Sequence, residues 1–160
     1  MKPRTLQHEI KKKHPFDSPE QEALLNLLRT SDRFSFQLER LFRAHGLTSP
    51  QYNILRILRG EGDRLPCLEI ASRMVAMVPA ITALIDRLTE VKLVVRERSE
   101  EDRRVIYIGL TEKGRKALAE LDGPVADLHH RLLGHLPSSE LRELSRLLTK
   151  ARASLLEAKG

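Results

Sequence analysis

Hydrophobic residues change their spacing twice between residues 79 and 114. Apolar side chains first recur at helical intervals, which predicts an amphipathic helix over 79–90 with proline in its first turn. Residues 94–98 and 105–110 are rich in β-branched side chains and alternate in polarity, and the six residues between them are polar or charged. This pattern predicts a hairpin of two strands with a charged tip. Thr111 is suited to cap a further helix, so the predicted order is helix, two-stranded ribbon, helix.

A long helix is predicted before this segment. Ser18, Pro19 and Gln21 have the residue types of a helix start with a capping box, and Gly46 supplies the stop. One stripe of this helix is almost entirely apolar: Leu24, Leu27, Leu28, Ser31, Phe34, Leu38, Leu41 and Phe42. A helix of this length needs more apolar cover than one small domain provides, and we expect a second subunit to provide it.

Two shorter helices are predicted between these segments. Thr48 and Gln51 form a second capping box for a helix that ends near residue 60. Residues 61–64 are predicted to be a loop, and residues 66–74 a short helix. Together with the helix described first, they form a helix-turn-helix arrangement that presents the second helix to the DNA major groove.

The C-terminal part is predicted to be helical again. A helix runs from Thr111 toward Leu133, with a kink or a short break at Gly123-Pro124, because proline removes an N–H and clashes with the preceding turn. A last helix starts after Pro137. Its apolar stripe consists of Leu141, Leu144, Leu147, Leu148, Ala151 and Leu155.

The charge of the chain agrees with a polyanionic partner without requiring one. Among 160 residues there are 28 Lys and Arg against 22 Asp and Glu, a net charge of +6. Residues 1–17 read as a basic tail, in which the run 11–14 is either an arm that touches phosphates or a solvated segment. The single cysteine cannot form an internal disulfide and no segment resembles a signal peptide or a membrane span, so we expect a cytoplasmic protein.

Five motifs in this order resemble the MarR family of bacterial transcription regulators: Leu47-Thr48-x-x-Gln51, Asp86-Arg87-Leu88, Leu93-Val94-x-Arg96, Asp102-Arg103-Arg104 and Leu110-Thr111-Glu112-Lys113-Gly114. The resemblance implies a mainly α fold, with a winged helix-turn-helix domain that carries a two-stranded wing (residues 47–110). The N- and C-terminal helices (18–46 and 111–160) would form a dimerisation domain, preceded by the basic tail (1–17). In this family a two-fold dimer places two reading helices about 34 Å, one turn of DNA, apart.

The reading helix departs from the family at Ala83, where an Arg suited to bind guanine is common. Thr82 can exchange hydrogen bonds, whereas Val78, Ala80 and Ala83 offer only apolar contact to thymine methyl groups. We therefore expect weak hydrogen-bond readout and A·T-rich half-sites. Arg87 either contacts DNA or joins Asp86 in an internal ion pair that fixes the helix against its neighbours.

The predicted wing carries more positive charge than the reading helix. The family signature, transferred residue by residue, makes Asp102 the brace of the tip and Arg104 the residue that enters a narrow A·T minor groove. The alternative is a charged tip that is simply solvated. The expected DNA-binding residues are Val78, Ala80, Thr82, Ala83, Arg87, Arg96, Arg98, Arg103 and Arg104.

The resemblance also implies a small-molecule effector, often an aromatic anion, bound between the dimerisation helices and the winged helix. The candidate residues near that cleft are Arg40, Arg43, His45, Tyr52 and Arg56, each Arg being alternatively a surface charge. The histidines lack metal-ligand spacing and Cys67 is expected to be buried as a small apolar residue, so we expect no metal and no cofactor.

The predicted function is a homodimeric, sequence-specific DNA-binding transcription regulator, a repressor released from a pseudo-palindromic operator by such an effector. The alternative is a helical dimer that uses a degenerate winged helix as a protein-interaction module without specific DNA binding. Ala83 and the acidic residues Asp86 and Glu90 favour that alternative. No catalytic motif occurs at usable spacing, so an enzyme is not expected.

Overall fold

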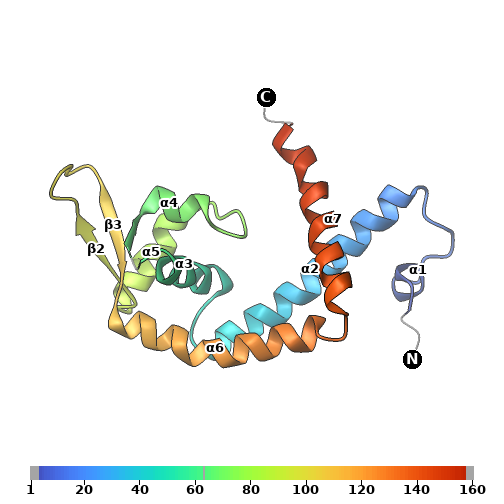
Figure 1. The fold of residues 1–160 in the computed structure, drawn as a ribbon, viewed down its shortest axis with the longest axis horizontal. Helices are drawn as coiled ribbons and strands as arrows, with labels where there is room; N and C mark the ends of the chain where they lie inside the picture. Colours follow the sequence, from blue (N-terminus) through green and yellow to red (C-terminus); the bar gives the residue numbers. More distant parts are fainter. Residues whose placement is uncertain (1–3, 63, 158–160) are drawn as a thin grey trace.

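The computed structural model describes residues 4–62 and 64–157. Its elements, in chain order, are α1 (Leu6–Glu9), α2 (Pro19–Ala44), α3 (Ser49–Gly60), β1 (Arg64–Pro66), α4 (Cys67–Ser72), α5 (Ile81–Glu90), β2 (Val94–Arg98), β3 (Ile106–Leu110), α6 (Glu112–Leu133) and α7 (Ser138–Glu157). The helices α3, α4 and α5 gather with the sheet at one end of the molecule, whereas α1 lies at the other end and α7 on the same side as α1 (Figure 1). The mainly helical fold with a wing is the one predicted.

Three of the predicted helix starts are confirmed together with their caps. The Ser18 hydroxyl accepts a hydrogen bond from Gln21 N at the start of α2. Thr48 and Gln51 bond reciprocally to each other's backbone N–H in the capping box of α3. Thr111 caps α6 by accepting from Gly114 N. Each cap satisfies donors that the first helical turn leaves open, which is why these starts were readable from local sequence.

The sheet contains one strand more than the predicted hairpin. β2 and β3 pair antiparallel from Val94 opposite Leu110 to Arg98 opposite Ile106, as expected. The third strand, β1, pairs with the other edge of β3, so that the order is β1-β3-β2. Residue 64 was expected to end a loop and residue 66 to begin a helix, so no strand was predicted here. A three-residue strand that contains a proline shows no alternation, and only its pairing with β3 defines it.

One predicted helix start was wrong, and of the kink or short break expected at Gly123-Pro124 the break does not occur. The helix expected over 79–90 begins at Ile81, after an Ala80 cap that has no side-chain hydrogen bond. The short break allowed for at Gly123-Pro124 is absent, because α6 continues through Pro124. Proline disfavours a helical residue before it chiefly through a clash with that residue's Cβ, and Gly123 has no Cβ. The chain therefore loses one hydrogen bond at Pro124 but keeps the helix.

Residues 1–17 hold a short helix that was not predicted. Within the described part of this segment, α1 is capped by the Thr5 hydroxyl, and Leu6 is buried. Glu9 forms an ion pair with Arg29 of α2 at 2.9 Å. One buried leucine and one partly exposed ion pair therefore attach this basic segment to the rest of the chain.

The hydrophobic core lies between the helix-turn-helix and the first half of α6. Its fully buried members include Ile54, Leu55, Leu58, Ile70, Ile85, Leu88, Ile108, Leu118 and Leu121. These side chains come from α3, α4, α5, β3 and α6, so the core fixes the reading helix and the wing in one rigid unit. In the described part of the chain, no helix has the length and apolar character needed to cross a membrane.

Candidate nucleic-acid interface

The tip of the wing is built around Ser99. This side chain is almost fully buried, and its hydroxyl accepts hydrogen bonds from the backbone N–H groups of Glu101 and Asp102 at 3.2 Å each. Ser99 N also donates to Val105 O across the tip at 3.0 Å. The turn is therefore held by its own backbone, with Ser99 as the acceptor at its centre. Sequence reasoning missed this residue, although a serine just before an acidic turn is a recognisable signal.

Asp102 holds the next residues of the tip. Its Oδ1 accepts from Arg104 N at 3.0 Å and from Arg104 Nε at 3.3 Å. The Arg104 side chain nevertheless remains 93% exposed. A guanidinium tethered at its Nε still presents its outer nitrogens to an anionic partner. Arg103 and Arg98 are exposed on the same tip and strand.

The base of the wing is joined to α6 by the Thr111–Gly114 turn. The Thr111 hydroxyl lies 2.8 Å from Lys92 O and 3.0 Å from Leu93 O, and it also accepts from Gly114 N at 3.0 Å. Lys113 Nζ donates to Val91 O at the end of α5. The motif therefore connects the end of the reading helix, the start of β2 and the start of α6, which explains its fixed distance from the wing tip.

The exposed face of α5 has little capacity for hydrogen bonding. Thr82 and Ala83 are exposed, and Asp86 forms an ion pair with Arg96 of β2. The expected pairing of Asp86 with Arg87 is not seen. Instead, Asp86 fixes the helix against the wing, and Arg96, an expected DNA contact, is partly neutralised. Arg87 is exposed, and the structure shows no ion-pair partner for it among the described residues.

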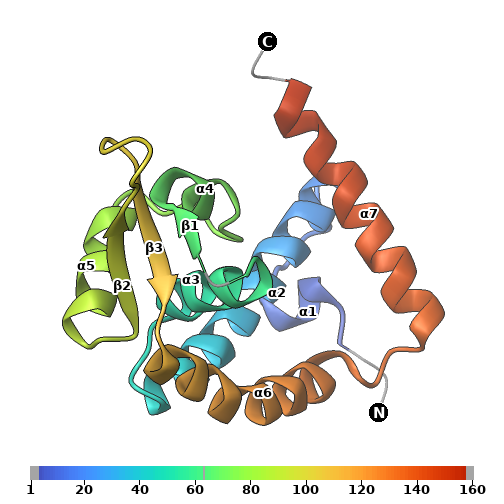
Figure 2. The ribbon, with the colours of Figure 1, turned by 60° about the vertical axis from the view of Figure 1, so that its left-hand side comes forward.

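A second ion pair orders the outer surface of the sheet. The Arg64 guanidinium lies 4.3 Å from the ring centroid of Tyr107 and 3.6 Å from a carboxylate oxygen of Glu97. The three residues come from β1, β3 and β2, so they bridge the sheet from edge to edge. α5 lies beside β2 at the outer side of this sheet, and the wing tip projects beyond it (Figure 2). A helix and a charged hairpin in this arrangement are suited to a groove and to the neighbouring backbone of DNA.

Comparison with known proteins gives the same interpretation. The family model of the transcriptional regulator SarA/Rot matches residues 38–121, more than half of the chain. The chain belongs to the MarR/SarA family of winged helix-turn-helix transcription regulators. It is accordingly a DNA-binding regulator and not an enzyme.

Individual DNA-binding regulators match most of the chain. A MarR transcription factor from Planctomyces limnophilus is 46% identical, with 84% of this chain and 98% of that chain covered and a TM-score of 0.65. The regulator MgrA of Staphylococcus aureus is 29% identical over 153 residues, which are 96% of this chain and 97% of MgrA. BpsR of Bordetella bronchiseptica, whose DNA binding is regulated by 6-hydroxynicotinic acid, is 24% identical and shares the fold, with a TM-score of 0.74 over 86% of this chain and 97% of BpsR.

Of the five residues expected to form the effector site of this family member, only Arg56 borders one of the two cavities described here. Arg43 is bound by Glu39, and His45 Nδ1 lies 3.0 Å from Leu41 O. Tyr52 stacks on Phe42 with ring centroids 4.2 Å apart, and its partial burial raises the pKa of the Tyr52 hydroxyl. Arg56 borders a cavity of about 330 Å³ that it shares with Ile57, Gly60, Glu61 and Arg73. Arg40 is exposed and borders neither this cavity nor the one described next.

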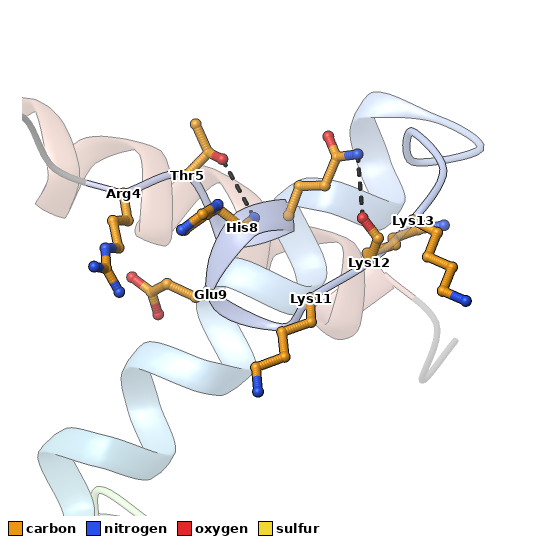
Figure 3. Close-up of a pocket in the computed structure, with 8 residues that line it drawn as sticks. Arg4, Thr5, His8, Glu9, Lys11, Lys12 and Lys13 are labelled. Carbon is orange, nitrogen blue, oxygen red and sulfur yellow. Dashed lines mark hydrogen bonds between the residues drawn. The ribbon is translucent and has the colours of Figure 1, made fainter.

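A larger cavity of about 660 Å³ lies at the N-terminal segment, away from these residues. Its lining comes entirely from residues 4–13, which include Arg4, Lys11, Lys12 and Lys13. Figure 3 shows these basic side chains spread around α1 in different directions. They do not converge on one point, so the cavity offers diffuse positive charge and no defined anion site.

Two kinds of candidate residue remain, the single cysteine and the possible metal ligands. Cys67 is partly buried at the first position of α4 and packs against the core. Among residues 4–62 and 64–157, no group of three or more His, Cys, Asp or Glu side chains is arranged to hold a metal ion.

Proposed function

We propose that this family member acts as a homodimeric, sequence-specific repressor that binds a pseudo-palindromic operator. In this proposal, residues 18–46 and 111–160 form the dimerisation region, residues 47–110 bind DNA, and residues 1–17 form a basic tail. The observation that carries the proposal is the pairing of a rigid winged helix with two long helices whose apolar faces are uncovered in the single chain.

The uncovered faces support the dimer. On α2, Leu24 and Leu28 are each 56% exposed and Phe36 is 65% exposed. On α7, Leu144, Leu147 and Leu155 are also exposed. Soluble monomers rarely leave continuous apolar surface of this kind in water. A second copy that packs its own α2 and α7 against these helices would cover it, and two-fold symmetry would set two α5 helices in register with two half-sites.

The winged helix supports specific DNA binding. The N-terminal end of α5 would enter the major groove, and Arg104 would reach the minor groove from a tip that Ser99 and Asp102 hold in place. Arg98 and Arg103 would contact phosphates. Arg96 is paired with Asp86, so we assign it mainly to positioning the helix against the wing.

We further propose that a small effector controls DNA binding. A small aromatic or anionic ligand could act only by binding differently to the operator-competent and the released arrangement of the dimer. Regulation of BpsR by 6-hydroxynicotinic acid supports this class of ligand. Arg40, Arg43, His45, Tyr52 and Arg56 remain the candidate site, which would have to be completed by the partner subunit or by a movement between the two regions.

Selection of bound sites from random duplex DNA by the purified protein tests the proposal. We expect a pseudo-palindrome with A·T-rich flanks. Arg104→Ala should weaken binding to that site about 10- to 100-fold, and most strongly where the flank is A·T-rich. Arg103→Ala is the matched control, because loss of a phosphate contact should weaken binding to all duplexes equally and reduce the salt dependence. Enrichment of no motif, with the same affinity for every duplex, would favour the protein-interaction module.

The oligomeric state is tested separately by sedimentation. Leu28→Glu places a charge in the proposed interface and should shift the protein from dimer to monomer at micromolar concentration. Leu68→Glu is the matched control, because Leu68 is equally apolar and 83% exposed but lies on α4, outside the proposed interface. Equal dimer masses for both variants would contradict the assignment of α2 to the interface.

A further inference from the structure

The segment that leads into the reading helix has an unusually apolar surface. Between Met74 and Ile81 the chain reads Val-Ala-Met-Val-Pro-Ala, and Thr82 is the only polar residue before Leu84. Met77 is 98% exposed and Val75 is 85% exposed. Large apolar side chains that are fully exposed on an ordered surface indicate an interaction site. Because this segment lies outside the helices that we assign to the dimer, a second copy of the chain does not account for it.

The backbone of this segment is held by contacts to its neighbours. Val75 N donates to Asn53 Oδ1 of α3 at 3.0 Å. Leu84 N donates back to Ala80 O at 3.4 Å, and Pro79 restricts the residue before it. Asn53 therefore acts as a positioning residue that anchors the loop to the helix-turn-helix core.

Two of the charged side chains near this surface, Arg73 and Asp86, are already engaged in ion pairs. Arg73 is paired with Glu61 at 2.6 Å and with Glu69 at 3.4 Å. Asp86, one turn after Thr82 on α5, is paired with Arg96. At the end of α5 that would approach base edges, the Thr82 hydroxyl is then the main group available for hydrogen bonding. The rest of that end offers methyl and thioether groups.

The occupant of this surface follows from its position and from its apolar character. The N-terminal residues of a recognition helix contact base edges in the major groove, and Met77 stands four residues before the first residue of α5, Ile81. In the major groove, the apolar group that a base presents is the C5 methyl of thymine. Methionine is flexible and polarisable, and it fills irregular apolar gaps well.

We infer that Met77, with Ala80 and Ala83, reads C5 methyl groups of pyrimidines, so that the protein distinguishes thymine from uracil and 5-methylcytosine from cytosine. This inference rests on the proposed specific DNA binding and deepens it, because it names the chemical group that gives the specificity. A regulator that recognises its site in this way also responds to cytosine methylation within that site.

Duplexes that differ only in methyl groups test the inference. On the selected operator, each thymine in a half-site is replaced by deoxyuridine, and affinity is measured by fluorescence anisotropy with wild type, Met77→Gln and Val91→Ala. We expect uracil to lower wild-type affinity about fourfold at one or two positions per half-site, the effect of one buried methyl group. Met77→Gln keeps the length of the side chain but should abolish the difference between thymine and uracil at one position. Val91→Ala, at the far end of α5, should keep it.

A second pair of duplexes separates methyl readout from changes in DNA stiffness. Replacing the sensitive T·A pair by C·G should weaken binding, and 5-methylcytosine at that position should recover part of the loss for wild type but not for Met77→Gln. Equal affinity for thymine and uracil at every position, or a uracil effect that Met77→Gln leaves unchanged, would overturn the inference while specific binding stands. Failure of the unmodified operator to bind more tightly than arbitrary duplex would overturn the proposed function, and the inference with it.

Discussion

Replacing Gly114 by alanine tests how the wing is attached to α6. Gly114 is buried in the first turn of α6, and its N–H is bound by the Thr111 hydroxyl. An alanine Cβ placed on this backbone would overlap the carbonyl oxygen of Leu93 and would lie 2.7 Å from Leu110 Cδ1. Leu93 begins the path into β2 and is fixed by hydrogen bonds to Thr111, so its carbonyl group cannot move without disturbing the base of the wing.

The expected magnitude follows from two opposing terms. Overpacking of one methyl group against fixed atoms costs about 1–3 kcal/mol. Alanine in place of glycine inside a helix contributes about 1 kcal/mol in the opposite direction. Because the closest contact is with a backbone atom, we expect an overpacking cost in the upper part of that range. The net loss in the free energy of unfolding is then about 1–2 kcal/mol. Gly60→Ala, at the end of α3, adds the same methyl group where no atom lies within 4 Å, and it should be neutral or stabilising by up to about 0.5 kcal/mol.

Thermal and urea unfolding of both variants at one fixed protein concentration would measure the difference, since the stability of a dimer depends on concentration. A gap of about 2 kcal/mol corresponds to roughly 4–8 °C in Tm for a chain of this size. Equal stability of Gly114→Ala and Gly60→Ala would refute the close packing of α6 against Leu93. It would also refute our explanation of why a glycine ends the Leu110–Gly114 motif.

Two further predictions concern the wing tip and the junction of α3 with α6. Ser99→Ala removes the acceptor of two backbone N–H groups and should reduce operator affinity about three- to tenfold with little change in Tm. Ser72→Ala, which removes an exposed serine on α4, should leave affinity unchanged, and equal affinities would argue against Ser99 as the organiser of the tip. Arg59 donates two hydrogen bonds to Asp122 at 2.8 and 3.0 Å, which lower the pKa of that carboxyl below its usual value of about 3.9. Because the pKa of Asp122 is lower in the folded than in the unfolded state, the ion pair stabilises the folded protein above the usual carboxyl pKa of about 3.9. This stabilisation is lost as the pH falls through the lowered pKa. Asp122→Asn should therefore be less stable than wild type at pH 6 but not at pH 2. The gap should be under about 1 kcal/mol because the pair is largely exposed, and a gap that persists at pH 2 would contradict this linkage.

Local sequence rules predicted the elements that depend on near neighbours in the chain. The capped starts of α2, α3 and α6 were correct because a cap and its acceptor are three residues apart. The hairpin was correct within one residue because alternation is visible inside each strand. The motif that ends at Gly114 identified the family, and the structure explains its spacing through the hydrogen bonds of Thr111.

The candidate site was predictable only in part. Asp102 was expected to brace the tip and Arg104 to enter the minor groove; the hydrogen bond between them was not predicted, although it joins residues only two positions apart. The partner of Asp86 was not predicted, since Arg96 lies on the next element and approaches only when β2 packs beside α5. The assignments of DNA contacts and effector residues remain predictions.

The sequence by itself determined where the capped helices α2, α3 and α6 start, which faces are apolar and which family the motifs resemble, because periodicity and capping act within one or two turns. Only the tertiary structure decided that β1 joins the sheet, that Ser99 is buried at the wing tip, and that Arg56 alone among the effector candidates borders one of the two described cavities. Each of these depends on how segments and side chains pack in three dimensions. Local sequence rules, which act between near neighbours in the chain, do not determine that packing. The apolar run before α5 needed both kinds of information. The sequence shows its composition, and the tertiary structure shows that Met77 is exposed to solvent.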